Sequence, residues 1–122
     1  MKRPAVRRGE FWTVDFEPQS HREEPGKSGR PALVLQTDAL NQAGHASTIV
    51  IPGTSQASSN YDDMFPLRVR LAANVGNGLR HTTDMLIDQV RAISNRRLMK
   101  RIGLADAATL ARIEQALRLL IS

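Results

Sequence analysis

The chain has 122 residues, no cysteine and a formal net charge of +5, with 17 Lys and Arg residues against 12 Asp and Glu residues. This length fits one domain over residues 1–122 that can bury its own core, and the lack of cysteine excludes a disulfide framework and a cysteine-based metal site. The basic first residues precede no apolar segment, and no run is long enough to span a bilayer, so we expect a cytoplasmic protein without a secretory signal or membrane contact.

The basic side chains are mostly arginines, since lysine occurs only at positions 2, 27 and 100. Arginine binds phosphate through two parallel N–H groups and stacks on bases. The composition therefore favours a polyanionic partner, either a nucleic acid or an acidic protein. The alternative is an ordinary solvated surface, and charge alone does not separate these interpretations.

The first half of the chain predicts three strands. Residues 11–16 are rich in β-forming side chains, and residues 30–36 are apolar enough for a strand buried on both faces. A polar loop over residues 19–29 separates these two strands. The third strand covers residues 48–51, and Pro52-Gly53 is expected to end it.

The second half predicts shorter elements. Residues 65–71 alternate, so that Leu67, Val69 and Leu71 should face the core while Arg68 and Arg70 face away. The remaining expectations are a turn over 74–78, a strand pair or one bent strand over 84–93, a short helical turn over 94–98 capped by Ser94, and a last strand over 100–104.

A C-terminal helix is the clearest element. Asp106 is a suitable N-cap, and Glu114 and Arg118 are spaced to form an ion pair on the outer face. Helical spacing also relates a set of apolar residues that should pack on the core: Leu110, Ile113, Leu117, Leu120 and Ile121. Short strands followed by one helix predict a mainly β fold, a small antiparallel barrel with a C-terminal α-helix.

Five segments occur in an order and spacing that match one family. They are residues 8–15 (RGEFWTVD), 29–35 (GRPALVL), 51–55 (IPGTS), 88–91 (DQVR) and 101–103 (RIG). Over essentially the whole chain, this set resembles the MazF/PemK/Kid toxins of type II toxin–antitoxin systems.

The resemblance implies an SH3-like, partly open antiparallel barrel of the PemK/CcdB type with a C-terminal helix. It implies a homodimer that cuts single-stranded RNA (mRNA) as a sequence-specific endoribonuclease needing no metal or other cofactor. It also implies a cognate antitoxin whose acidic tail is disordered when free. Such an enzyme uses the ribose 2′-hydroxyl as nucleophile, which explains a preference for RNA over DNA.

Arg30 and Thr54 match the two catalytic residues of the family. A guanidinium stays charged at any working pH and can stabilise the extra charge of the phosphorane. The threonine hydroxyl can donate to a phosphate oxygen, and the preceding glycine lets the backbone come close. Ser55 and Gln56 are further candidates for binding RNA. Without the resemblance, Arg30 would be taken as a strand-opening residue and Thr54 as a turn residue.

The general base is less well defined by the pattern. His21, Glu23 and Glu24 lie in the long first loop, where some family members carry an assisting acidic residue or histidine. Asp88 matches an aspartate proposed as the base in one branch, but that branch has an arginine where this chain has Leu86. Asp88 is therefore expected to hold Arg30, or the dimer, by a charge-assisted hydrogen bond.

Gln89 and Arg91 are expected to contact RNA or the dimer interface. Arg91 also belongs to a basic cluster that either extends the phosphate-binding track or solubilises the barrel, with Arg96, Arg97, Lys100 and Arg101. The converging carboxylates of a two-metal nuclease are absent from the sequence pattern. Two other interpretations stay open: a barrel-fold toxin acting on a protein such as DNA gyrase, and a catalytically inactive member that binds RNA or antitoxin.

Overall fold

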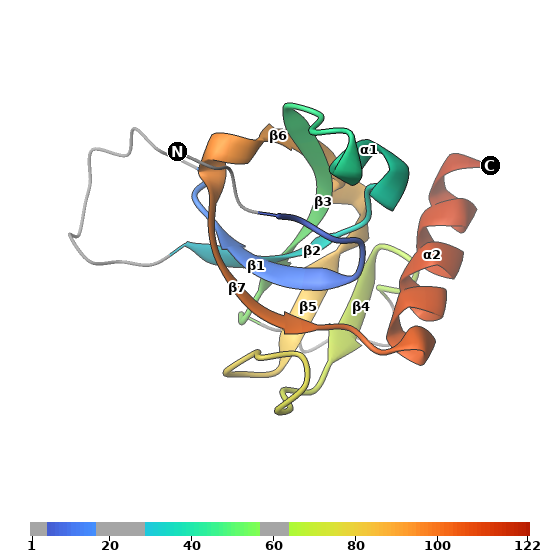
Figure 1. The fold of residues 1–122 in the computed structure, drawn as a ribbon. Coiled ribbons are helices and arrows are strands. Elements are labelled where there is room, and N and C mark those ends of the chain that lie inside the picture. Colours follow the sequence, from blue (N-terminus) through green and yellow to red (C-terminus); the bar gives the residue numbers. More distant parts are fainter. Residues whose placement is uncertain (1–4, 17–28, 57–63) are drawn as a thin grey trace.

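The computed structural model describes residues 5–16, 29–56 and 64–122. These residues form seven strands, two α-helices and two short 3₁₀ turns (Figure 1). The elements are β1 (Glu10–Val14), β2 (Arg30–Val34), α1 (Asp38–Gln42), β3 (Ser47–Thr54), β4 (Arg68–Leu71), β5 (Thr83–Leu86), η2 (Ile87–Gln89), β6 (Arg91–Ser94), η3 (Asn95–Arg97), β7 (Leu98–Leu104) and α2 (Ala107–Ile121).

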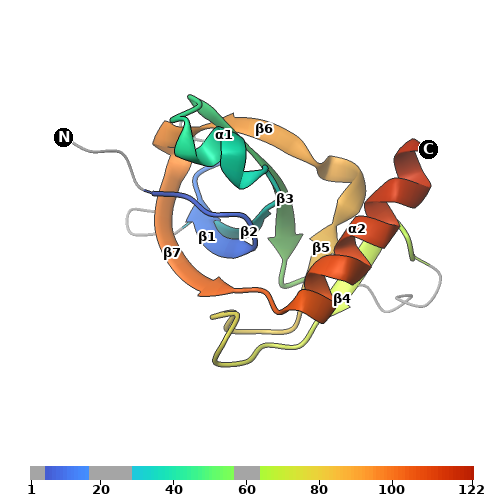
Figure 2. The ribbon, with the colours of Figure 1, turned by 45° about the vertical axis from the view of Figure 1, so that its right-hand side comes forward.

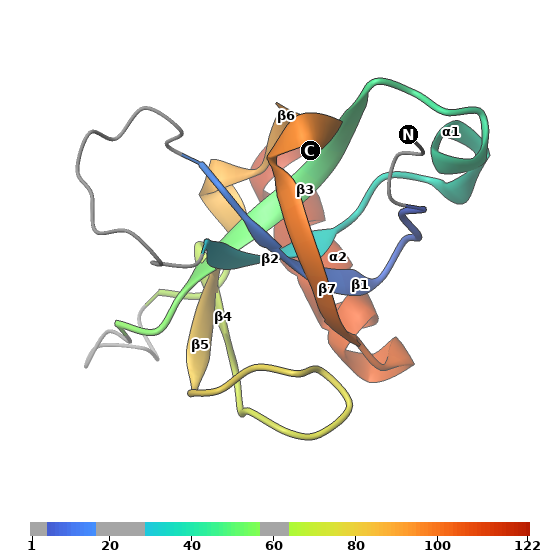
Figure 3. The same cartoon turned by 60° about the vertical axis from the view of Figure 1, so that its left-hand side comes forward.

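The strands form one curled antiparallel sheet in the order β4-β5-β3-β2-β1-β7, and β6 pairs additionally with β3. Figure 2 shows how strongly the sheet bends, with α2 beside β4 and β5. Figure 3 shows α1 at the opposite end of the molecule from β4 and β5. The outer strands β4 and β7 do not pair with each other within the described residues, so the barrel is partly open. The predicted fold class is therefore confirmed.

Two groups of buried side chains lie on opposite faces of the central strands. Phe11, Leu33 and Ile51 belong to the larger group, which also contains Met85 and Ile113. The alternate residues along the same strands enter the second group, which consists of Val6, Trp12, Val14, Ala32, Val34, Val50, Ile93 and Leu98. Alternation places successive side chains on opposite faces of a strand, so β2 is buried on both faces, as its apolar sequence predicted.

The C-terminal helix begins as predicted, at the Asp106 cap, whose carboxylate accepts a 2.7 Å hydrogen bond from the Thr109 backbone N–H. Ile113 and Ala116 are fully buried, and Leu110, Leu117 and Leu120 pack against the larger core group. Ile121 was wrongly assigned to the apolar stripe, because it is 72% exposed in the last turn. No helix in the described ranges is long and apolar enough to cross a membrane.

The predicted pair between Glu114 and Arg118 is also not formed. Glu114 instead forms an ion pair with Arg8, whose other guanidinium nitrogen donates to the Leu35 carbonyl. Arg8 lies in the segment before β1, so it ties the start of the described chain to α2 and to Leu35, directly after β2. Residues four apart on a helix can form an ion pair, but here Glu114 pairs with a residue from another part of the chain, which the sequence spacing cannot predict.

Several element boundaries differ from the prediction in the middle of the chain. The connection over 37–47 contains the short helix α1, which Thr37 caps by accepting from the Ala39 N–H. Pro52 does not end β3, because it lies opposite Ala32 of β2, and the strand continues when Gly53 and Thr54 pair with β5. The strand predicted to begin at residue 65 is shorter than expected, because residues 64–67 form a turn and β4 begins at Arg68.

Residues 84–93 form neither a strand pair nor a single strand. β5 pairs with Gly53 and Thr54, while β6 pairs with residues 47–50 of the same strand β3. The turn η2 separates β5 from β6, and both strands pair with β3, at different residues. Of the two predicted alternatives, one bent strand is therefore nearer to the observed structure than a strand pair. The predicted helical turn capped by Ser94 is confirmed, because the Ser94 hydroxyl accepts from the Arg96 N–H.

Acid should weaken this fold through two carboxyl groups that accept hydrogen bonds at the starts of the helices. Hydrogen bonds from the Arg8 backbone and the Asn41 side chain lower the pKa of Asp38 below 3.8, and bonds from Thr109 do the same for Asp106. A pKa depressed in the folded state adds stability that is present above the unfolded pKa and is lost as pH falls through the folded value. Urea unfolding should therefore show a steeper loss of stability below about pH 4 than an Asp38→Asn/Asp106→Asn variant shows. Parallel acid profiles for the two proteins would contradict this.

Candidate active site

Arg30 stands at the first position of β2 with its side chain exposed. Its Nη2 atom donates to the Gly53 carbonyl at 3.3 Å, and its guanidinium carbon lies 5.9 Å from the centre of the Phe16 ring. The residue before it has no room for a side chain, because a Cβ at Gly29 would lie 2.3 Å from the Val14 carbonyl oxygen. This close approach of β2 to β1 fixes where Arg30 emerges from the sheet.

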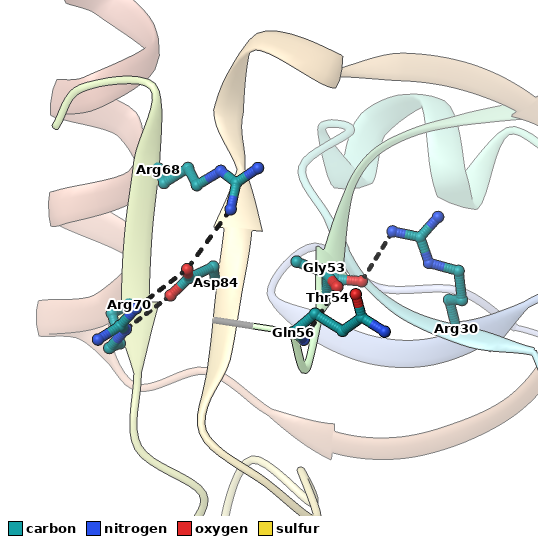
Figure 4. A network of polar contacts seen from close by, with 7 residues as sticks. All are labelled: Arg30, Gly53, Thr54, Gln56, Arg68, Arg70 and Asp84. Atoms are coloured by element: carbon teal, nitrogen blue, oxygen red, sulfur yellow. Dashed lines mark hydrogen bonds and ion pairs between the residues drawn. The ribbon is translucent and has the colours of Figure 1, made fainter. Parts of the chain in front are cut away.

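Thr54 is the last residue of β3 and is half-buried. Its hydroxyl oxygen accepts a 3.1 Å hydrogen bond from the Gln56 backbone N–H, which turns the chain away from the sheet (Figure 4). Before it, a Cβ at Gly53 would lie 2.7 Å from the Thr83 methyl group, so the glycine permits close packing of β3 on β5. Ser55 and Gln56 follow and are exposed.

The sheet register brings Arg30 and Thr54 to the same place. Ala32 is paired with Pro52, and continuing this antiparallel register by two residues sets Arg30 opposite Thr54. Opposite residues in an antiparallel pair present their side chains on the same face. Figure 4 shows Arg30 reaching toward the Gly53 carbonyl, next to Thr54 and Gln56. The two residues singled out by the resemblance are thus adjacent, with one guanidinium and one hydroxyl at a shared edge.

Phe16 is a member of this site that the sequence analysis missed. It is half-buried and follows β1. The guanidinium carbons of two arginines lie near the centre of its ring, Arg30 at 5.9 Å and Arg91 at 5.3 Å. A cation near an aromatic face is attracted by the negative face of the ring. Phe16 therefore gathers the two arginines from β2 and β6, which are far apart in sequence. Its only sequence signal was an aromatic residue following the buried part of a strand.

The acidic candidates are placed differently. Asp88 and Gln89 lie in η2 and are exposed, and within the described part of the chain Asp88 makes neither a hydrogen bond nor an ion pair with Arg30. Arg30 is positioned by Gly53 and Phe16 instead. The other three candidates for a general base, His21, Glu23 and Glu24, lie outside the described residues.

Two arginines of the basic cluster, Arg97 and Arg101, make contacts that stabilise the fold. Arg101 donates to the buried Glu10 carboxylate at 2.8 Å, and the same carboxylate accepts from the Trp12 indole N–H. Arg97 donates to the carbonyl oxygens of Asp15 and Phe16, both at 3.3 Å. These two arginines therefore hold β1 in place, whereas Arg91 joins Arg30 at the Phe16 ring. Trp12 is buried in the core, as its strand position suggested.

A second polar group lies beside Thr54. Asp84 of β5 is opposite Thr54 and is completely buried. Its carboxylate accepts from Arg70 through Nε at 2.8 Å and Nη2 at 3.3 Å, and Arg68 lies 3.7 Å away (Figure 4). Both arginines were expected to face away from the core, and their shared partner was not predicted from the sequence. An aspartate within an otherwise buried strand was the available signal.

This arrangement can bind and stabilise a phosphate. It offers a planar guanidinium held by a backbone carbonyl, a nearby hydroxyl and a second guanidinium on the same aromatic ring. Such preorganised donors favour a transition state that accumulates negative charge on phosphate oxygens. Within residues 5–16, 29–56 and 64–122, no three His, Asp or Glu side chains are grouped so that they could hold a metal ion.

The fold and this edge define a small, partly open β-barrel protein with an arginine and a hydroxyl gathered at the ends of neighbouring strands. The model of the PemK-like, MazF-like toxins of type II toxin–antitoxin systems matches residues 7–121. The chain therefore belongs to this toxin family.

Individual relatives agree with the family assignment. The chain is 35% identical over 118 residues to the endoribonuclease MazF9 of Mycobacterium tuberculosis, covering 93% of this chain and 94% of that protein. It is 39% identical over 106 residues to the endoribonuclease toxin ChpB of Escherichia coli, with coverage of 86% and 84%. In a crystal structure of MazE–MazF from Deinococcus radiodurans, one chain superposes with a TM-score of 0.71 and 27% identity, covering 97% of both chains.

Proposed function

We propose that the protein is an endoribonuclease that cleaves single-stranded RNA, such as mRNA, at specific sequences without a metal ion. The proposal is supported by the family and by relatives that are named endoribonucleases. One structural observation carries it for this chain. Arg30 donates to the carbonyl of Gly53, the residue directly before Thr54, so a guanidinium and a hydroxyl can reach the same phosphate.

In the proposed reaction, the ribose 2′-oxygen attacks the adjacent phosphorus after a base removes its proton. The bond from phosphorus to the 5′-oxygen then breaks, and that oxygen takes up a proton. The products are a 2′,3′-cyclic phosphate and a free 5′-hydroxyl. Arg30 binds the non-bridging oxygens as their charge grows, and Thr54 donates its hydroxyl hydrogen to one of them. The base is one of His21, Glu23, Glu24 and Asp88.

Other residues of the edge would bind the flanking RNA. Arg91 is held near Arg30 by the Phe16 ring, Ser55 and Gln56 are exposed directly after β3, and Gln89 is exposed in η2. Arginine stacks on bases as well as pairing with phosphate, whereas the amides can form hydrogen bonds with base edges. This division gives Arg91 a role in affinity and the polar turn residues a role in the choice of sequence.

We further propose that one domain of this kind acts in the cytoplasm as a homodimer and is neutralised by a cognate antitoxin. Solved structures with comparable folds include MazE–MazF from Deinococcus radiodurans. The net charge of +5 suits both RNA and an acidic protein segment.

The decisive test is a cleavage assay with purified protein and a long single-stranded RNA in the presence of EDTA. We expect cuts at a few short sequences, with 2′,3′-cyclic phosphate ends. A matched RNA carrying 2′-deoxyribose at a mapped cut should resist cleavage there. Absence of cleavage across several RNAs by folded protein would refute the proposed activity, and a DNA gyrase assay would then test action on a protein target.

RNA binding should depend steeply on salt. Each phosphate contact releases condensed counterions, so the logarithm of affinity should fall linearly with the logarithm of salt concentration, by about 0.7 per contact for a single strand. Fluorescence anisotropy with the deoxy-substituted RNA measures this slope without cleavage. An affinity that does not change between about 50 and 200 mM salt would contradict a phosphate-binding edge.

A further inference from the structure

The Asp84 cluster has no role in the chemistry described above, although it adjoins it. The Asp84 carboxylate is completely buried, whereas the Arg68 and Arg70 side chains are 28% and 29% exposed. A buried charge is costly unless it is paired, so the aspartate requires a cation. One arginine is enough for that purpose, and Arg70 supplies it through two hydrogen bonds.

Arg68 is the second cation at this carboxylate, and its contact is different in kind. Its Nη1 atom lies 3.7 Å from Asp84 Oδ2, which is within ion-pair range but too long for a hydrogen bond. Among the described residues, the Arg68 guanidinium makes no hydrogen bond. Counting Arg68, Arg70 and Asp84 alone, two positive charges face one negative charge, with the excess on the partly exposed Arg68, whose guanidinium still has donors to offer.

The register places this excess charge beside the proposed reaction centre. Thr54 is opposite Asp84, and Asp84 is opposite Arg70, so these side chains share one face of the sheet. Arg68 is two residues before Arg70 on β4 and lies on the same face. Neighbouring strands are about 4.8 Å apart, so β4 runs roughly 10 Å from Thr54. In Figure 4 the arginines of β4 and Arg30 lie on opposite sides of Thr54.

We propose that Arg68 binds a second phosphate of the RNA strand, next to the one that is cleaved. This inference rests on the proposed function. The RNA backbone would pass from Arg30 and Thr54 across β5 to Arg68, whose planar fork suits a phosphate oxygen pair. Asp84 and Arg70 act as positioning residues, because the buried carboxylate keeps the Arg68 guanidinium turned over β5 rather than free in solvent.

The test compares Arg68→Gln with Arg118→Gln. Arg118 is an exposed arginine on α2, away from this cluster, so the two variants lose the same charge. Binding of the deoxy-substituted RNA is measured over a series of salt concentrations. We expect Arg68→Gln to bind about tenfold more weakly at low salt and to lower the salt slope by about 0.7, while Arg118→Gln keeps the wild-type values.

A third variant separates binding from a merely structural role. Arg68→Lys keeps the charge without the fork, so the salt slope should return to the wild-type value while the affinity stays lower. Equal affinity and slope for wild type and Arg68→Gln, or a slope in Arg68→Lys as low as in Arg68→Gln, would overturn the second phosphate site. Cleavage by the wild type is scored separately, so failure of the proposed activity is distinguishable from failure of this site.

Discussion

Replacing Arg30 with alanine should lower the cleavage rate by about 10²–10³-fold. The side chain is exposed and, among the described residues, makes one hydrogen bond, with the Gly53 carbonyl, so its removal takes little from the core. What is lost is a fixed guanidinium that would meet the growing charge on the phosphorane. Single-turnover cleavage of a short RNA, followed with saturating enzyme, measures this effect, and growth after induced expression should recover in the same variant.

Two controls define that result. Arg30→Lys retains the charge but lacks the planar fork, so it should recover only part of the rate. Thermal unfolding should give nearly the same midpoint for wild type and Arg30→Ala. Full cleavage by a folded Arg30→Ala protein would remove Arg30 from the mechanism and leave the basic edge as a binding surface only.

Replacing Arg70 with alanine should instead act on stability, with a loss of roughly 3 kcal/mol in the free energy of unfolding. Arg70 donates two hydrogen bonds to the buried Asp84 carboxylate, and its removal leaves Arg68, 3.7 Å away, as an arginine beside that charge among the described residues. Breaking a buried ion pair costs about 3–5 kcal/mol, and the remaining arginine places the expected value at the lower end. Urea unfolding followed by tryptophan fluorescence of Trp12 gives the measurement.

A double variant tests the reason for this loss. In Arg70→Leu/Asp84→Val the buried carboxylate of residue 84 is gone, so the protein should be more stable than Arg70→Ala despite carrying more substitutions. If the double variant were the less stable protein, the packing of the arginine stem would explain the effect better than the unpaired charge.

The sequence predicted most reliably those features that depend on neighbours along the chain. The apolar run of β2, the Asp106 cap, the Ser94 cap and the apolar spacing up to Leu120 are all local patterns, and the structure confirms them. The errors involve long-range choices. Pro52 was expected to end a strand, but it lies where β3 passes from pairing with β2 to pairing with β5.

The same distinction applies to the candidate site. Arg30 and Thr54 came from the family resemblance, and their adjacency depends on a register that no local pattern encodes. The Phe16 ring and the Asp84 cluster were not predicted, because their partners come from strands distant in sequence. The predicted partner of Glu114 was wrong for the same reason, since Glu114 was expected to pair with Arg118 on its own helix but pairs with Arg8. The roles of His21, Glu23, Glu24 and Asp88 stay predictions.

The pairing of β1 with β7 has a consequence for when the protein can become harmful to its cell. It joins residues that are far apart in the sequence, and the Arg101–Glu10 contact spans 91 positions. Chains are synthesised at about 5–20 residues per second, and sheets dominated by distant pairings fold slowly, in milliseconds to seconds. Arg97 and Arg101 hold the strand that leads to Phe16, and both are made late. We therefore expect that a nascent chain cannot complete the Phe16–Arg30 edge until β7 has left the ribosome, so the proposed activity should appear only after that strand has been made.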